Sequence, residues 1–373
     1  MDQKPSVNEA EKEITSAGET AAEAAEAPEA VDELALAAAA TEAFLPEKLL
    51  VSPSPHLHAD DNSRSVMLDV CIALLPALVW GIYLFGFRVL TITLISIACA
   101  VASEYLYQRL MKMPLRVGDC SCIVTGLLLA LNLPASVPLW MPALGAVFAI
   151  IVVKQLFGGI GRNFVNPALA ARVFLFAWPH HMSTFPKPGE WVSPLKIVLP
   201  ETDIVAGATT MATLKDGTIP TNTSLFNAIL GYEGGCIGEV SALLLTAGYI
   251  YLLVRRVITW HIPVFYIGTV AVMTFVFSIS SLPYDFALYE IFSGGLFLGA
   301  IFMATDYATS PVTKIGRVIY AIGCGLVTVF IRYFGGYPEG VSFAILIMNL
   351  FVWYIDRYTK PVKFGGAKND NAK

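Results

Sequence analysis

The sequence predicts an all-α polytopic membrane protein of about ten transmembrane helices, in two inverted repeats with short, broken helices. Hydrophobic residues make up 56% of the 373 positions and charged residues only 14%, against about 25% in soluble domains. Mean hydropathy is +0.64. Apolar runs of membrane-spanning length recur along the chain and are continuous, not alternating. Because only helices and closed barrels satisfy their backbone in lipid, continuous runs favour helices.

Ten apolar segments are expected to form the helices. They are 67–86, 89–108, 120–135, 138–153, 166–178, 238–254, 262–281, 288–304, 316–334 and 339–356. The third, fourth, fifth and eighth are short for a hydrocarbon core about 30 Å thick. Short, Gly- or Pro-interrupted segments in corresponding halves indicate broken helices around a site near the bilayer midplane.

A weak internal repeat supports two halves. "TGLLLALNLP" (125–134) is similar to "SGGLFLGAIF" (293–302), and "GGIGRNFVNP" (158–167) precedes a helix as "SPVTKIGRVI" (310–319) does. The copies begin after an even and an odd number of crossings, which predicts that the two halves are inverted, as in many transport folds.

Charge distribution orients the expected bundle. With the N-terminus inside, the inner loops hold twelve Lys and Arg and the outer loops five, a clear positive-inside bias. Both termini are therefore expected in the cytoplasm. The expected organisation is an acidic tail at 1–50, a first membrane repeat at 51–178, an extracytoplasmic loop at 179–237, a second membrane repeat at 238–360 and a polar tail at 361–373.

The N-terminal tail is compositionally distinct from the rest of the chain. Residues 1–50 hold 12 acidic and 3 basic residues, are rich in Ala and Glu, and lack the cationic start of a secretory signal. They are expected to be disordered or partly helical, and a helix that docks on a partner is the alternative.

Several function classes have no support in the sequence. The six Cys include one close pair, Cys120 and Cys122, whose spacing is not that of a zinc or redox CxxC motif, so packing is favoured over an iron–sulfur or disulfide role. There is no Walker A loop, no GxGxxG after a strand and no HExxH, which argues against ATP, dinucleotide and zinc-protease chemistry. Nucleic acid is not an expected partner.

The stretch "RNFVNPALAARVFLFAWP" (162–179) predicts a helix that begins inside the membrane. Asn166 before Pro167 has the form of an N-cap followed by Pro at the first helical position. One interpretation is a capped re-entrant helix and nothing more. The other is that Asn163 and Asn166 offer amides to a polar ring system such as a flavin, beside the free N–H groups of a helix start.

A second polar stretch, "AGATTMATLKDG" (206–217), lies in the expected outer loop. Gly207 and Ala208 leave room for a bulky group to approach the Thr209 hydroxyl, and Lys215 could neutralise a phosphate nearby. An ordinary polar loop would have a similar composition, so the residues alone leave both interpretations open.

Resemblance to a known family decides between them. "TDIVAGATTMATLKDG" (202–217) is similar to the flavinylation site of the RnfD/NqrB family of membrane redox subunits, and "GGIGRNFVNPALAARVFLF" and "GDCSCIVTGLLLALNLP" are similar to its other motifs. The resemblance covers about 51 to 362. The family's string often begins with Ser or Thr and ends in Pro-Leu, whereas this chain has Ala206 and Thr210-Met211 there.

The resemblance implies the site residues and the cofactors. Thr209 is the residue expected to carry FMN through a phosphoester bond, preceded by Asp203, and Thr210 is the alternative attachment residue. Asn163 and Asn166 match a non-covalent riboflavin site described for the NqrB branch. A separate flavin transferase would attach the FMN, so Thr209 acts as a nucleophile only during maturation.

By the same resemblance, the chain is expected in the bacterial inner membrane as one subunit of a multi-subunit complex. Rnf complexes pass electrons from ferredoxin to NAD and export Na⁺ or H⁺, and the Nqr relative passes electrons from NADH to quinone. "ATTMATLKDG" is closer to the Rnf D pattern, so the Rnf D subunit is favoured over the Nqr B subunit. The chain would be part of an oxidoreductase and not catalytic alone.

Two alternatives of other classes stay open, a channel or solute carrier without cofactor and a purely structural scaffold. A channel has no reason to carry Gly-Ala-Thr in an outer loop. Ion coupling requires polar groups within the bundle, and ionisable residues in membrane segments are functional suspects. These are Asp69, Glu104, Asp119, Arg172, Glu239, Glu290, Asp306 and Asp356, of which Glu104 and Arg172 are expected to lie deepest.

Overall fold

A computed structural model describes the chain at residues 62–189, 191, 193–197, 210–215, 224–239, 241–278, 282–335 and 340–360. The chain divides into two compact units, Met1–Asp60 and Asp61–Lys373, and all of the described residues belong to the second. The predictions for the acidic tail at 1–50 and the polar tail at 361–373 lie outside the described residues.

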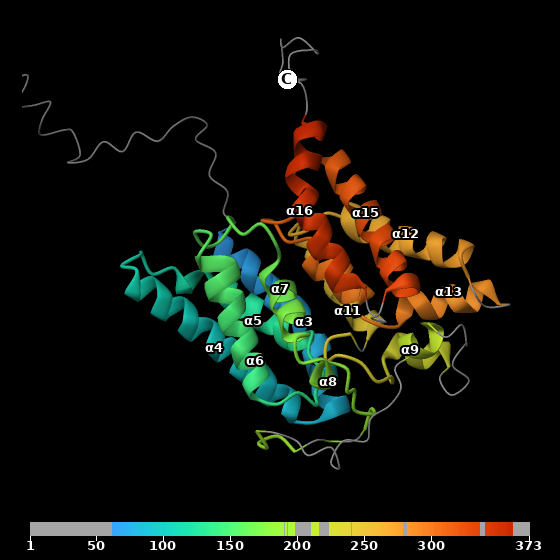
Figure 1. Cartoon of the computed structure of the whole chain (residues 1–373), viewed down its shortest axis with the longest axis horizontal. Helices are drawn as coiled ribbons and strands as arrows, with labels where there is room; N and C mark the ends of the chain where they lie inside the picture. The colour runs from blue at the N-terminus through green and yellow to red at the C-terminus, as the bar shows by residue number, and fades with distance from the viewer. Residues whose placement is uncertain are drawn as a thin grey trace, which may run out of the picture. The chain divides into compact units, whose positions relative to one another are not determined.

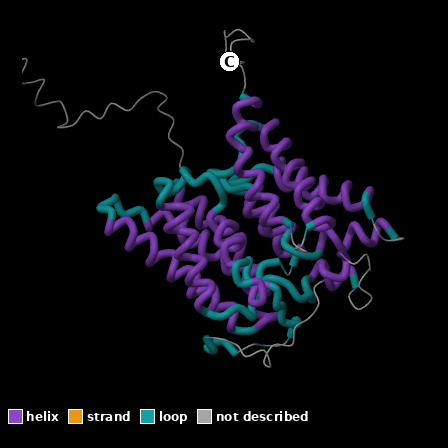
Figure 2. The backbone as a smooth tube through the Cα atoms, in the orientation of Figure 1, coloured by secondary structure: helices purple, strands orange, loops and turns teal. Residues whose placement is uncertain are grey.

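The described residues form helices and loops and no β-strand, which confirms the all-α prediction (Figure 2). In the described part of the chain, four helices are long and apolar enough to cross a membrane, and a bent pair of shorter helices makes a fifth span when counted together. Four further apolar helices have 10 to 17 residues. Each of the ten predicted segments overlaps one or more of the observed helices. The chain is a multi-pass membrane protein.

The first half of the membrane region is a bundle in which α4 packs against α5, α6 and the π-helix η2 (Figure 1). Its elements are α3 (Ser63–Phe85), α4 (Arg88–Leu110), the single 3₁₀ turn η1 (Val117–Asp119), α5 (Ser121–Leu131), α6 (Trp140–Phe148), η2 (Ala149–Gln155) and α7 (Pro167–Leu175). The close approach of α5 to α4 depends on Gly126, where a Cβ would lie 2.9 Å from the Ile97 Cα.

The second half is a bundle in which α12 packs against α13 and α15, and α15 against α16 (Figure 1). Its elements are α11 (Ala242–Val254), α12 (His261–Val276), α13 (Pro283–Phe292), α14 (Leu296–Leu298), the π-helix η4 (Gly299–Met303), α15 (Lys314–Phe334) and α16 (Val341–Thr359). Three short helices precede it, α8 (Pro179–Met182), α9 (Thr210–Lys215) and α10 (Leu225–Leu230).

The two halves share a distinctive feature. In each, a short α-helix runs directly into a π-helix, at α6–η2 and at α14–η4, and a loop then leads to a helix with a side-chain N-cap. The predicted eighth segment is broken, because α13 and the helix over Leu296–Met303 are bent by 58° at Ser293–Gly295. The inverted relation of the repeats and their exact boundaries stay predictions.

The halves meet where α3 packs against α11 and α7 packs against α16. One continuous apolar core runs through both halves and includes the fully buried Leu74, Leu129, Leu169, Ile301 and Tyr320. The π-helix η4 enters this core beside α12 and α16. The loop that follows η4 therefore comes to lie near the start of α7, and the candidate site forms there.

Candidate functional site

A large cavity among the described residues lies where the two halves meet. It has a volume of about 510 Å³, within the range of roughly 300–1,000 Å³ that is usual for small-molecule sites. Its walls come from α3, α5, the start of α7, α11 and the segment from η4 into the following loop. Asn163 and Asn166, singled out by the sequence motif, both line this cavity.

Asn166 serves as the N-cap of α7, as the sequence predicts. Its side-chain oxygen accepts hydrogen bonds from the backbone N–H groups of Ala168 and Leu169, at 3.0 and 3.3 Å. Its amide nitrogen donates to the carbonyl of Met303 at 3.2 Å, which ties the start of α7 to the end of η4. The predicted N-cap is confirmed, and one N–H of the Asn166 amide remains for a ligand.

Asn163 lies beside a carboxyl group that the sequence did not connect with it. Its amide donates to the Val165 carbonyl at 3.1 Å, and its side chain is also hydrogen-bonded to Asp306. The Asp306 carboxylate accepts from the Thr309 hydroxyl at 3.1 Å. Burial raises the pKa of Asp306, and the hydrogen bonds from Thr309 and Asn163 lower it by a smaller amount.

The lining of the cavity suits a flat, mostly apolar ring with polar edges. Val66, Met67, Val70, Leu128 and Phe302 supply apolar surface. Asn163, Asn166 and Asp306 gather at one side, where an amide and a carboxyl can both donate or accept hydrogen bonds. Such a combination of apolar walls and a few convergent polar groups is typical of cofactor sites. A flavin ring therefore fits the residues present.

The structure pairs most of the ionisable residues suspected from the sequence. Arg172 does not reach into the cavity described above, because its guanidinium donates to Glu239 at 2.9 Å and to Asn132 at 2.8 Å. The remaining pairs are Glu104 with Lys154 at 2.8 Å, Glu290 with Arg332 at 2.7 Å and Asp69 with Arg255 at 3.1 Å. Asp119 accepts from Ser121, and Asp356 accepts from the backbone N–H of Val312 at 3.1 Å.

Three cations that the sequence placed in loops are buried. Lys154 is 3% exposed and lies at the end of η2, Arg332 is 3% exposed, and Arg88 is fully buried. The Arg88 guanidinium donates to four carbonyls of the loops around it, those of Ala135, Val137, Ser193 and Lys196. Lys154 and Glu104 are 50 residues apart, so no local sequence pattern could have revealed their contact.

The residue expected to carry FMN, Thr209, lies outside the described residues, as does Asp203. The next residue, Thr210, begins α9 and is 7% exposed. Met211 and Leu214 of α9 pack into a small apolar cluster with Phe286 of α13. The Lys215 ammonium donates to the carbonyl of Gly335.

An all-α fold with several helices long and apolar enough to cross a membrane defines the class as a polytopic membrane protein. Comparison with known proteins identifies the family. Residues 50–365 match the family described as NQR2, RnfD, RnfE, and the chain belongs to this family.

Relatives of known designation are matched over nearly their full lengths. The chain is 47% identical to the D subunit of the Na(+)-translocating ferredoxin:NAD(+) oxidoreductase complex of Acetobacterium woodii, over 86% of this chain and 96% of the relative. It is 39% identical to the proton-translocating counterpart of Clostridium ljungdahlii, over 84% and 96%. It is 40% identical to the D subunit of the ion-translocating oxidoreductase complex of Stutzerimonas stutzeri, over 80% and 91%.

Proposed function

We propose that the chain is the D subunit of an Rnf-type, ion-translocating ferredoxin:NAD oxidoreductase, in which it passes electrons through bound flavin. The observation that carries this proposal is the match to D subunits of such complexes along 80% to 86% of the chain, together with the cavity lined by Asn163 and Asn166. Those names favour the Rnf D assignment over the Nqr B subunit. The coupled ion is Na⁺ or H⁺, since relatives named for each are similar to this chain.

The first proposed cofactor is FMN, bound covalently through a phosphoester on Thr209. A transferase would attach it during maturation, and the threonine then serves as a tether. The flavin can exchange one electron at a time while the protein supplies position and electrostatics. The docking of α9 by Met211 and Leu214 supports this proposal, because it fixes the chain one residue beyond the proposed attachment point.

A denaturing gel viewed under ultraviolet light tests this cofactor against the rival functions. We expect a fluorescent band at the 40.3 kDa mass of the chain when it is made in cells that contain the transferase. Thr209→Ala should darken the band and leave the protein inserted in the membrane, whereas Thr210→Ala should keep it fluorescent. A dark wild-type band would favour a carrier or a scaffold.

The second proposed cofactor is a non-covalent flavin, riboflavin, in the cavity lined by Asn163, Asn166 and Asp306. When bound, it would supply a second one-electron carrier between the halves of the chain. The test is the flavin released by acid from Thr209→Ala protein. Asn163→Leu should lower the amount of riboflavin released, at unchanged protein yield. An unchanged amount of riboflavin would show that Asn163 makes only local hydrogen bonds and does not bind the flavin.

We further infer a bacterial inner-membrane location, with both termini cytoplasmic and the Thr209 loop outside. The basis is the excess of Lys and Arg in the loops assigned to the inside. Single cysteines placed at residues 55 and 365 should react with a membrane-impermeant thiol reagent only after the cells are opened. A cysteine at residue 218 should react in intact spheroplasts. The reverse pattern would refute this orientation.

A further inference from the structure

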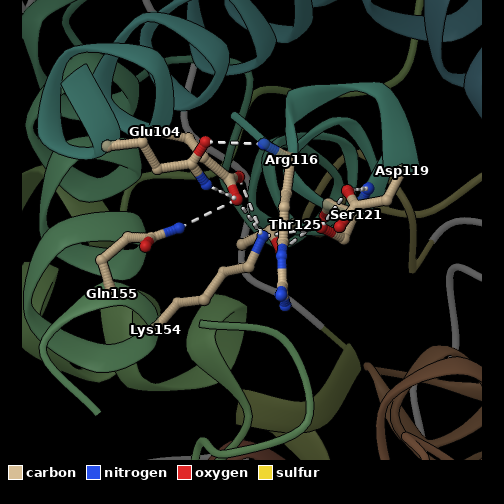
Figure 3. A network of polar contacts seen from close by, with 8 residues as sticks. Glu104, Arg116, Asp119, Ser121, Thr125, Lys154 and Gln155 are labelled. Carbon is tan, nitrogen blue, oxygen red and sulfur yellow. Dashed lines mark hydrogen bonds and ion pairs between the residues drawn. The ribbon is translucent and has the colours of Figure 1, made fainter. Parts of the chain in front are cut away.

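A wall of polar side chains lies between the large cavity and a smaller polar cavity of about 210 Å³. Figure 3 shows the contacts among these side chains. Lys154 and Ser121 line the large cavity. Glu104, Asp119 and Gln155 line the smaller one. Contacts between these five side chains therefore run from one cavity to the other, and Arg116 and Arg162 also line the smaller one.

An ion pair is the centre of this wall. The Lys154 ammonium lies 2.9 and 2.8 Å from the two oxygens of Glu104, and the Gln155 and Gln108 amides donate to the same carboxylate at 2.9 and 3.2 Å. Lys154 and Glu104 are 3% and 1% exposed. Lys154 and Gln155 are adjacent residues of the π-helix η2, and both reach this one carboxylate.

A hydrogen-bonded chain leads from the ion pair to the polar cavity. The Lys154 ammonium donates to the Ser121 hydroxyl at 2.6 Å, and that hydroxyl donates to Asp119 at 2.7 Å. The backbone N–H of Ser121 donates to the same Asp119 oxygen at 2.9 Å, which fixes the carboxylate against the start of α5. A hydroxyl that accepts on one side and donates on the other is the unit from which proton chains are built.

We propose that Asp119, Ser121 and Lys154 form a proton relay from the polar cavity to the occupant of the large cavity, with Glu104 as the fixed counter-charge of Lys154. This inference rests on the proposed function, because it requires a proton-accepting group in the large cavity. Reduction of a bound redox group adds negative charge in a site of low dielectric constant. Delivery of one proton compensates that charge.

The relay balances in protons and moves no electrons. Lys154 gives one proton to a base in the large cavity and becomes a neutral amine. That amine accepts the hydroxyl proton of Ser121 while Ser121 takes a proton from the Asp119 carboxyl group. The Asp119 carboxylate is reprotonated by a hydronium ion of the polar cavity, which becomes water. The net result is one proton carried from the polar cavity to the large one. Lys154 ends as an ammonium again beside Glu104.

The test is the rate at which the cavity flavin of purified, full-length Thr209→Ala protein is reduced by dithionite, followed by its absorption in H₂O and in D₂O. Ser121→Ala should retain the wild-type flavin content and slow the proton-linked phase at least about tenfold. Ser121→Thr, which keeps the hydroxyl, should restore the rate. Asp119→Asn should slow the same phase and provides a second variant if Ser121→Ala fails to fold.

Ser103→Ala is the matched control. Ser103 is 7% exposed against 5% for Ser121, neighbours Glu104 in the chain, and donates only to the Cys99 carbonyl at 2.6 Å. We expect the cavity flavin of the Ser103→Ala protein to be reduced at the wild-type rate. Wild-type rates in Ser121→Ala and Asp119→Asn, with the flavin present, would overturn the relay alone. Absence of extractable flavin in the parent protein would overturn the proposed second cofactor and the relay with it.

Discussion

Removal of the negative charge of Glu104 is expected to destabilise the protein strongly. The Glu104 and Lys154 side chains are 2% and 4% exposed, so Glu104→Gln leaves a buried ammonium without its anion. Loss of one partner of a buried pair costs about 3–5 kcal/mol of unfolding free energy. The pair of Asp69 with Arg255 is the internal comparison, because the Arg255 side chain is 51% exposed. Asp69→Asn should therefore cost about 1 kcal/mol or less.

The assay is unfolding of the purified protein in mixed micelles, monitored by loss of helical circular dichroism. The double variant Glu104→Gln/Lys154→Met removes both charges, so it should recover most of the stability lost in Glu104→Gln. Equal effects of Glu104→Gln and Asp69→Asn would refute the reasoning from burial. Strictly additive effects of Glu104→Gln and Lys154→Met would show that the two side chains do not interact.

Three further outcomes are expected. Gly126→Ala should lower the free energy of unfolding by about 1–3 kcal/mol, because the new Cβ meets the backbone of Ile97. Gly118→Ala is the control, because a Cβ at that position meets open space. Equal losses of unfolding free energy in the two variants would contradict the packing argument. Asn166→Ala should cost about 0.5–2 kcal/mol through the lost cap, with Asn166→Asp retaining more stability than Ala, as thermal unfolding would show. Burial raises the pKa of the Glu233 carboxyl group. The protonated carboxyl therefore stabilises the folded protein below the unfolded-state pKa of Glu233, and this stabilisation is lost as the pH rises through the higher pKa of the folded state. Glu233→Gln should remove that loss from a pH titration of stability, and an unchanged profile would contradict it.

Periodicity and composition predicted the helices well, because continuous apolar runs leave a chain in lipid few alternatives. The capping role of Asn166 was also readable, since an Asn-Pro pair specifies a helix start locally. The short eighth segment was one of those from which broken helices were predicted, and α13 and α14 are indeed separated by a break, but the 58° angle could not be read from the sequence.

The parts of the site that depend on tertiary contacts could not be read from the sequence. Asp306 approaches Asn163 only because the loop after η4 returns to the start of α7. A hydropathy pattern assigns cations at the ends of apolar runs to loops, because a charged residue ends such a run. This applies to Lys154, Arg88 and Arg332. Their burial depends on partners far along the chain, such as Glu104 and Glu290.

Mass spectrometry of the peptide spanning residues 197–215 tests most directly whether the chain carries a tethered flavin. In protein purified from its native host, we expect that peptide to carry the mass of FMN, less the water lost in forming the phosphoester, with fragmentation that places it on Thr209. An unmodified peptide recovered in full from cells with an active transferase would contradict the proposed covalent cofactor. Fragmentation that places the FMN on Thr210 would show that the attachment residue was wrong.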